Sequence, residues 1–213
     1  MLKNLFLLIF CLGLVSCASN PPRVDQSASS EELYKMGNSY VQKQNYNEAM
    51  KYYSQAAEQG NAKAEYAIGY LYRTGHGVEQ NYNTATSWFE RSAAKGNPQA
   101  LHSLGMRFLL GQGTAQDDTK ALVLFQQAAN QGNPYSENEL GYMYAAGKGV
   151  PQDYNKAAEW YQRAADHGIP TAQYNLALMY ENGIGVTADP EKAQDYLKRA
   201  AAKGFGPAKK ALE

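Results

Sequence analysis

Ser92 and Lys95 have the spacing of a serine nucleophile whose hydroxyl is deprotonated by a lysine one helical turn further on. The sequence also contains three histidines, a residue type that often serves as a general base: His76, His102 and His167. No two of them have the local spacing of a metal site, and a Ser/His/Asp triad would need residues from distant segments. The only two cysteines are Cys11 and Cys17, so zinc and thiol chemistry have almost no candidates.

Four Gly-x-Gly pairs form a second group of candidates, and Gly75 and Gly77 are the first pair. Glycine-rich loops bind phosphate when they connect a strand to a helix and continue to GxGxxG or to GK[ST]. Each pair here follows a segment with helical periodicity and continues to neither pattern. We interpret the pairs as helix ends, where glycine adopts positive φ without a Cβ penalty.

These glycines belong to a repeat that runs through most of the chain. Five glycines recur at intervals of 36 residues: Gly60, Gly96, Gly132, Gly168 and Gly204. The Gly-x-Gly pairs keep the same period, as do five alanines from Ala49 to Ala193. Self-similarity at a fixed interval of this length is the sequence signature of a solenoid.

The repeat also tests the catalytic candidates, because a residue with a special role is expected to break the pattern. Ser92 stands at a helix position that the other copies fill with alanine, and no SDN or KTG partner motif occurs. We therefore predict that the protein is not an enzyme and binds neither a metal nor a cofactor.

The fifth copy shows how one unit is built. Apolar residues at every fourth position predict a helix over 171–182, which ends at Gly183. A second helix is predicted after Asp189, a good N-cap, with Pro190 at its first position and Gly204 at its end. Each copy is therefore a pair of helices, and no strand is predicted.

The segment from Leu140 to Gly168, LGYMYAAGKGVPQDYNKAAEWYQRAADHG, resembles a Sel-like repeat, a relative of the tetratricopeptide repeat with a longer loop between its helices. Residues 62–204 contain four such units, whereas the first unit lacks the loop and resembles a tetratricopeptide repeat. The resemblance implies an all-α, right-handed α-solenoid of about five helix pairs. The expected repeats span about 31–61, 62–97, 98–133, 134–169 and 170–204, within a solenoid domain of residues 31–213.

Both ends of the solenoid are expected to carry caps, since a terminal repeat has no neighbour to cover its apolar face. Ser29 and Glu32 have the spacing of a capping box at the start of the first helix. Residues 205–213 predict a short final helix with Ala208 and Leu212 buried against the fifth repeat.

The first helix of each pair has one face turned away from its partner helix. Tyr66 and Tyr70 lie two residues on either side of the core position Ile68 and are turned about 200° from it. The resemblance places the first helices on the concave surface, and amphipathic side chains of low charge are typical of binding surfaces. The predicted partner-binding residues are Tyr34, Tyr66, Tyr70, His102, Met106, Asn138, Tyr142, Tyr174 and Leu178. The alternative is that several of them pack against the adjacent repeat.

The N-terminal segment has the pattern of an export signal. Lys3 precedes an apolar run over residues 5–15, which would span only about 16 Å as a helix and is too short to cross a membrane. Residues 14–17, Leu-Val-Ser-Cys, resemble the lipobox of bacterial lipoproteins. The resemblance implies that residues 1–16 are removed as a signal peptide and that Cys17 carries acyl chains such as palmitate. Ordinary secretory cleavage near Ala18 is the alternative.

The same resemblance implies a location. Ala18 after the lipid-bearing cysteine implies an outer-membrane anchor with the protein facing the periplasm, and exposure on the cell surface stays open. Residues 17–30 contain the lipidated cysteine and a polar, Pro/Ser-rich stretch, which we interpret as a flexible tether.

Charge and surface type together suggest a function. The chain has 20 Lys+Arg and 20 Asp+Glu, which argues against nucleic-acid binding. We expect a lipid-anchored periplasmic scaffold that binds a protein or peptide in its concave groove, within an envelope assembly or export system. A cell-wall glycan or polysaccharide is the alternative ligand. A lesser alternative is the β-lactamase-like, penicillin-binding activity described for cysteine-rich relatives, whose cysteines this sequence lacks. The partner's identity and the oligomeric state stay open.

Overall fold

The structure, a computed structural model, describes residues 28–213. These residues form eleven helices and no strand, as the repeat pattern predicts. The helices are α1 (Ser30–Gln42), α2 (Tyr46–Glu58), α3 (Ala62–Thr74), α4 (Tyr82–Ala94), α5 (Pro98–Leu110), α6 (Asp118–Ala129), α7 (Pro134–Ala146), α8 (Tyr154–Asp166), α9 (Pro170–Asn182), α10 (Pro190–Ala202) and α11 (Gly206–Ala211). The predicted signal peptide, Cys17 and most of the predicted tether lie outside the described residues.

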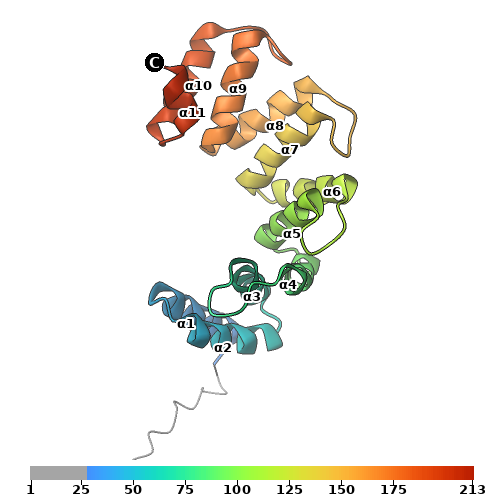
Figure 1. Cartoon of the computed structure of the whole chain (residues 1–213), viewed down its shortest axis with the longest axis vertical. Helices are drawn as coiled ribbons and strands as arrows, with labels where there is room; N and C mark the ends of the chain where they lie inside the picture. The colour runs from blue at the N-terminus through green and yellow to red at the C-terminus, as the bar shows by residue number, and fades with distance from the viewer. Residues whose placement is uncertain (1–27) are drawn as a thin grey trace, which may run out of the picture.

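The helices pack as five consecutive pairs. In each pair an odd-numbered helix, here called the A helix, packs along the even-numbered B helix that follows it. Each B helix then packs on the A helix of the next pair, so the pairs follow one another along a curved path (Figure 1). In the middle of this path α5 lies on the inner side of the bend and α6 on the outer side. The predicted α-solenoid is confirmed.

Side-chain caps start most of these helices where the sequence places them. The B helices α6, α8 and α10 begin at aspartates whose carboxylates accept a backbone N–H two or three residues inside the helix: Asp117, Asp153 and Asp189. Ser29 and Glu32 form the predicted capping box on α1, with both reciprocal hydrogen bonds present. The caps satisfy N–H groups that have no partner within the helix, which explains why the boundaries follow local sequence so closely.

The Gly-x-Gly loops do more than end a helix. Gly147 ends α7 in the left-handed region with a φ of 66°, as predicted. The second glycine, Gly149, also has a positive φ, and a Cβ on it would lie 2.5 Å from the backbone oxygen of Asp118 in the preceding repeat. The second position therefore requires glycine because the loop packs directly on the neighbouring B helix.

Within the first four pairs, an A helix approaches its B helix through a glycine placed against an aromatic ring. A Cβ on Gly141 would lie 2.5 Å from Cδ1 of Tyr161, and the same arrangement pairs Gly69 with Phe89 and Gly105 with Phe125. The equivalent positions of the fifth repeat hold Ala177 and Leu197, which lie in one core cluster. A smaller partner on the B helix thus accompanies a larger residue on the A helix.

The C-terminal cap differs from its prediction in one residue. Ala208 is fully buried, as expected, and α11 packs on α10. The prediction that Leu212 is buried is wrong: its exposed fraction is 39%. Helix α11 ends at Ala211, so Leu212 lies past the last turn and does not continue the buried face.

No helix in residues 28–213 combines the length and the hydropathy needed to cross a bilayer.

Candidate functional site

The serine and lysine of the nucleophile pattern make separate structural contacts. Ser92 is fully buried and its hydroxyl donates to the backbone oxygen of Ala62 at 2.6 Å. Lys95 Nζ lies 2.9 Å from a carboxylate oxygen of Glu65 and donates to the backbone oxygen of Gly60 at 3.0 Å. Ser92 therefore links α4 to α3 through a hydrogen bond, and Lys95 is a counter-ion of the buried Glu65 carboxylate.

The three histidines are likewise distributed among different repeats. His76 stacks on Tyr46 with ring centroids 4.7 Å apart, and His102 Nδ1 lies 3.0 Å from the Ser136 hydroxyl. His167 Nδ1 lies 2.7 Å from the buried carboxylate of Glu137. Among residues 28–213, no three His, Cys, Asp or Glu side chains are grouped so that they could hold a metal ion.

The predicted binding residues of the second and third repeats meet in one pocket of about 540 Å³, here called the central pocket. It is formed by three consecutive A helices, α3, α5 and α7. Its lining residues are Tyr66, Tyr70, Arg73, His102, Ser103, Met106, Arg107 and Tyr135. Four of these eight residues belong to the set predicted from the sequence, so the central pocket lies where the A-helix groove was predicted.

An adjoining pocket of about 370 Å³, here called the N-terminal pocket, lies between the first two repeats. It includes the predicted residue Tyr34 and shares Tyr66 and Tyr70 with the central pocket. Apolar side chains such as Val41 and Leu71 complete it. The two pockets therefore form a continuous surface across the first four repeats, and Tyr66 and Tyr70 lie at their junction.

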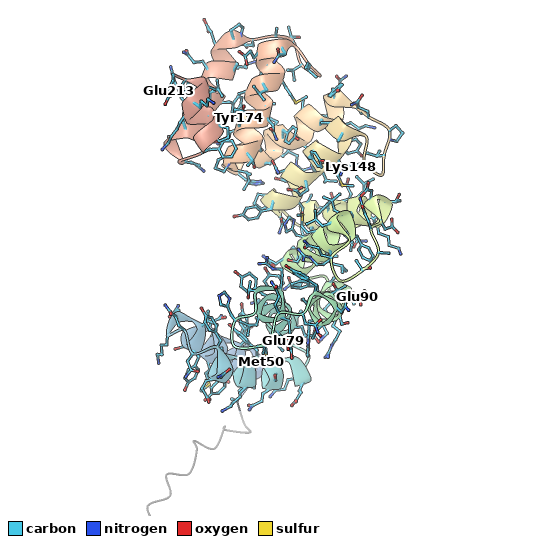
Figure 2. The ribbon with its side chains drawn as sticks, in the orientation of Figure 1. Met50, Glu79, Glu90, Lys148, Tyr174 and Glu213 are labelled. Carbon is cyan, nitrogen blue, oxygen red and sulfur yellow. The ribbon has the colours of Figure 1, made fainter. Side chains whose placement is uncertain are left out.

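The predicted residues of the last two repeats have mixed roles. Tyr142 on α7 is 40% exposed, with Lys148 Nζ 5.5 Å from its ring centroid. Asn138 accepts a hydrogen bond from Thr171 of the next repeat at 3.2 Å. Tyr174 on α9, labelled in Figure 2, packs on Phe205 with ring centroids 5.5 Å apart. Leu178 is half-buried on the same helix. Tyr142 thus belongs to an accessible surface, whereas Asn138 and Tyr174 also join neighbouring segments.

The central pocket contains both core and surface side chains. Tyr66 packs on Phe89 with ring centroids 5.7 Å apart, and burial raises the pKa of its hydroxyl. Burial lowers the pKa of His102 to about 4, so its imidazole is neutral at pH 7. Tyr70 is 40% exposed, and the guanidinium carbon of Arg73, Cζ, lies 4.7 Å from its ring centroid. Among these positions, some side chains are packed in the core, as Tyr66 is, and others are exposed on the surface, as Tyr70 is. Both alternatives that the sequence left open therefore occur.

The two arginines of this pocket, together with Ser103 and Tyr135, were not among the predicted residues. Arg107 had a detectable signal: it occupies the position that Leu71, Met143 and Met179 fill in the other Sel-like copies. A charged residue in an apolar register breaks the repeat, and comparing the copies at this position would have found it.

Comparison with known proteins agrees with this architecture. The family model described as Sel1 repeat matches residues 28–61, 62–97, 98–133, 134–169 and 170–205. No curated protein matches the sequence significantly.

Solved structures give the same result. A Sel1 repeat protein from Oxalobacter formigenes is 34% identical with a TM-score of 0.77, over 83% of this chain and 70% of that one. A protective antigen of uropathogenic Escherichia coli is 32% identical with a TM-score of 0.78, over 84% of this chain. The match spans only 39% of the antigen. An immunity protein of Pseudomonas aeruginosa, 24% identical with a TM-score of 0.58 over 88% of this chain and 70% of that one, shares the fold.

Proposed function

Because the chain belongs to the Sel1 repeat family, whose fold is suited to protein–protein scaffolds, we propose that it is a non-enzymatic scaffold that binds a protein partner along its A helices. The observation that carries this proposal is the central pocket, to which three successive repeats contribute side chains. A ligand that fills it contacts several repeats at once, which suits an extended segment of polypeptide.

The side chains around the pockets support a protein ligand. Tyr70 and Tyr142 each present a large ring that is 40% exposed. Tyrosine provides contact area at a small cost in conformational entropy and keeps a hydroxyl for hydrogen bonding, which is why it is enriched at interaction hot spots. The A helices are held by core packing on both sides, so these rings are positioned before a partner arrives.

The proposal includes a membrane anchor at Cys17 and a place in the periplasm, on the inner face of the outer membrane. Its support is the lipobox-like sequence over residues 14–17 and the polar tether that follows. Two or three acyl chains, each burying many methylenes at about 0.8 kcal/mol, hold a protein stably on a bilayer where one chain does not.

Site-specific photo-crosslinking in bacterial envelopes tests the binding surface. A photoreactive residue is placed in the full-length chain at Tyr70 or at Tyr142, and at Tyr154 as a matched control. Tyr154 is similarly exposed, at 41%, but begins the B helix α8. We expect a discrete protein adduct from positions 70 and 142 and none from 154. The same adducts from all three positions would refute the groove as the binding surface.

A second measurement separates the protein ligand from a glycan. The soluble chain that starts at residue 18 is sedimented with insoluble peptidoglycan. Co-sedimentation that is lost in the Tyr70→Ala/Tyr142→Ala variant, combined with no protein adduct from positions 70 and 142, would favour a glycan ligand. The variant Tyr154→Ala is the control for a general loss of tyrosine.

A further inference from the structure

Arg107 is a charged residue in a core position. It lies on α5, and its side chain is 6% exposed. The equivalent residues Leu71, Met143 and Met179 are buried and apolar. One guanidinium nitrogen, Nη1, donates to the side chain of Gln112 at 2.7 Å, while the buried Nε has no hydrogen-bond partner. Removing a charge from water without a counter-ion is costly, so the position invites a functional explanation.

A second arginine increases the cost. Arg73 lines the same pocket, and neither Arg73 nor Arg107 forms an ion pair with any residue of the described chain. The pKa of Arg107 is lowered first by burial and then by the positive charge of Arg73, so the two guanidinium groups affect each other electrostatically.

The buried carboxylates of this protein, unlike these arginines, have counter-ions. Glu65 lies 3.0 Å from Arg91 and 2.9 Å from Lys95, although its own side chain is fully buried. The fold therefore provides counter-ions for the buried carboxylate of Glu65, whereas within residues 28–213 Arg107 and Arg73 have only neutral partners: Gln112 and the Tyr82 ring for Arg107, and the Tyr70 ring for Arg73.

The remaining lining of the central pocket suits a carboxylate. It contains the hydroxyl groups of Tyr66, Tyr70, Tyr135 and Ser103, and no acidic residue. His102 is neutral at pH 7 because burial lowers its pKa to about 4, so the two arginines dominate the local charge. The planar guanidinium offers parallel N–H donors that match the two oxygens of a carboxylate.

We propose that the central pocket binds an acidic side chain, Asp or Glu, in an extended segment of a protein partner, and that a flanking apolar side chain of that segment occupies the N-terminal pocket. This inference rests on the proposed function, since it specifies what the partner presents. The two pockets meet at Tyr66 and Tyr70, so one short segment reaches both. The apolar N-terminal pocket favours a peptide over inorganic phosphate, which has nothing to place there.

Short peptides test the chemistry directly. The soluble chain is titrated with Ac-Phe-Glu-Phe-NH2, with Ac-Phe-Gln-Phe-NH2 and with inorganic phosphate, and the Nε–Hε NMR signals of Arg73 and Arg107 are followed. We expect both arginine signals to shift saturably with the Glu peptide. The Gln peptide should bind about tenfold more weakly or worse, the ratio expected when a charge-assisted hydrogen bond is lost. Equal binding of the Glu and Gln peptides, or phosphate binding as tightly as the Glu peptide, would overturn the proposal.

A variant with a built-in folding control completes the test. Arg107→Met introduces the residue that the fourth and fifth repeats carry at this position, so we expect the fold and the thermal unfolding midpoint to be retained. Binding of the Glu peptide should fall about tenfold or more, to the level of the Gln peptide. Arg73→Gln, at a half-buried position, is the second variant if the first fails to fold, with the same expected loss.

The two proposals fail in different ways. The crosslink from Tyr142, which lies outside the central pocket, is repeated in the Arg107→Met chain. An adduct that forms in the wild type and is undiminished in the variant refutes the arginine site while the scaffold function stands. If the wild type forms no adduct, the proposed function fails, and the peptide titration still decides the chemistry of the pocket.

Discussion

The contact between Gly141 and Tyr161 allows a quantitative test of how the helix pairs are held together. A Cβ at position 141 would lie 2.5, 2.7 and 2.8 Å from three atoms of the Tyr161 ring. Ordinary carbon contacts are about 3.5–4.0 Å, so in Gly141→Ala the ring must move by about 1 Å. Tyr161 is 4% exposed and has little room to move. Overpacking of this kind costs about 1–3 kcal/mol.

The helix propensity of alanine works in the opposite direction. Replacing glycine by alanine inside a helix stabilises it by about 1 kcal/mol, so the net loss for Gly141→Ala is about 0–2 kcal/mol. A double-mutant cycle with Tyr161→Leu separates the two effects. On the leucine background the clash is absent, as it is for Ala177 and Leu197 in the fifth repeat, and Gly141→Ala should stabilise by about 1 kcal/mol.

Urea denaturation followed by circular dichroism measures the four free energies of unfolding. We expect a coupling energy of about 1–3 kcal/mol between the two substitutions, with unchanged m-values. Gly206→Ala serves as the control because a Cβ there meets no atom within 4 Å apart from its two chain neighbours. Its effect on the free energy of unfolding should be the same with and without Tyr161→Leu. A coupling energy near zero would refute the glycine–aromatic contact as the feature that sets the distance between A and B helices.

Three further predictions concern a buried charge, a buried imidazole and the anchor. Glu65→Leu should leave the free energy of unfolding unchanged or raise it by about 1–4 kcal/mol. Its cationic partners are partly exposed, and the next repeat has a leucine, Leu101, at the same position. A lower free energy of unfolding in urea would contradict this. Since the folded-state pKa of His102 lies at about 4, below the unfolded value, protonation favours unfolding and stability is lost as the pH falls from about 6.5 towards 4. Between pH 7.5 and 5, the free energy of unfolding of the wild type should fall by about 2 kcal/mol more than that of His102→Asn. If the two free energies change in parallel with pH, the effect of His102 is excluded. Cys17→Ser should move the full-length protein from the membrane fraction to the soluble fraction, and retention in the membrane would argue against lipidation.

The repeat pattern predicted most of the fold because the relevant interactions are local. The eleven helices of residues 28–213, the B-helix caps from Asp117 to Asp189 and the glycines that end the A helices α3, α5, α7 and α9 all follow from residues within about one turn of each other. Periodicity at 36 residues then fixed the architecture, since helix pairs with one apolar face can bury it only by stacking.

The residues of the central pocket were predicted only in part. Spacing on the A helices identified Tyr66, Tyr70, His102 and Met106, which do meet in the central pocket. Spacing gave no indication that Tyr174 packs on Phe205, or that Gly149 must accommodate the backbone of the preceding repeat. Those contacts join residues about 30 positions apart, and their geometry depends on how each pair is rotated on the next.

Which segments are helices, where they start and stop, and that they stack in order could all be predicted from the residue pattern, because those properties depend on neighbouring residues and on a strict period. Only the tertiary structure brought Arg73 and Arg107 to one pocket without a counter-ion, and only it separated exposed tyrosines from packed ones. Burial and charge pairing depend on every side chain that surrounds a position, including those of the adjacent repeats, whereas helix boundaries depend mainly on residues nearby in the sequence.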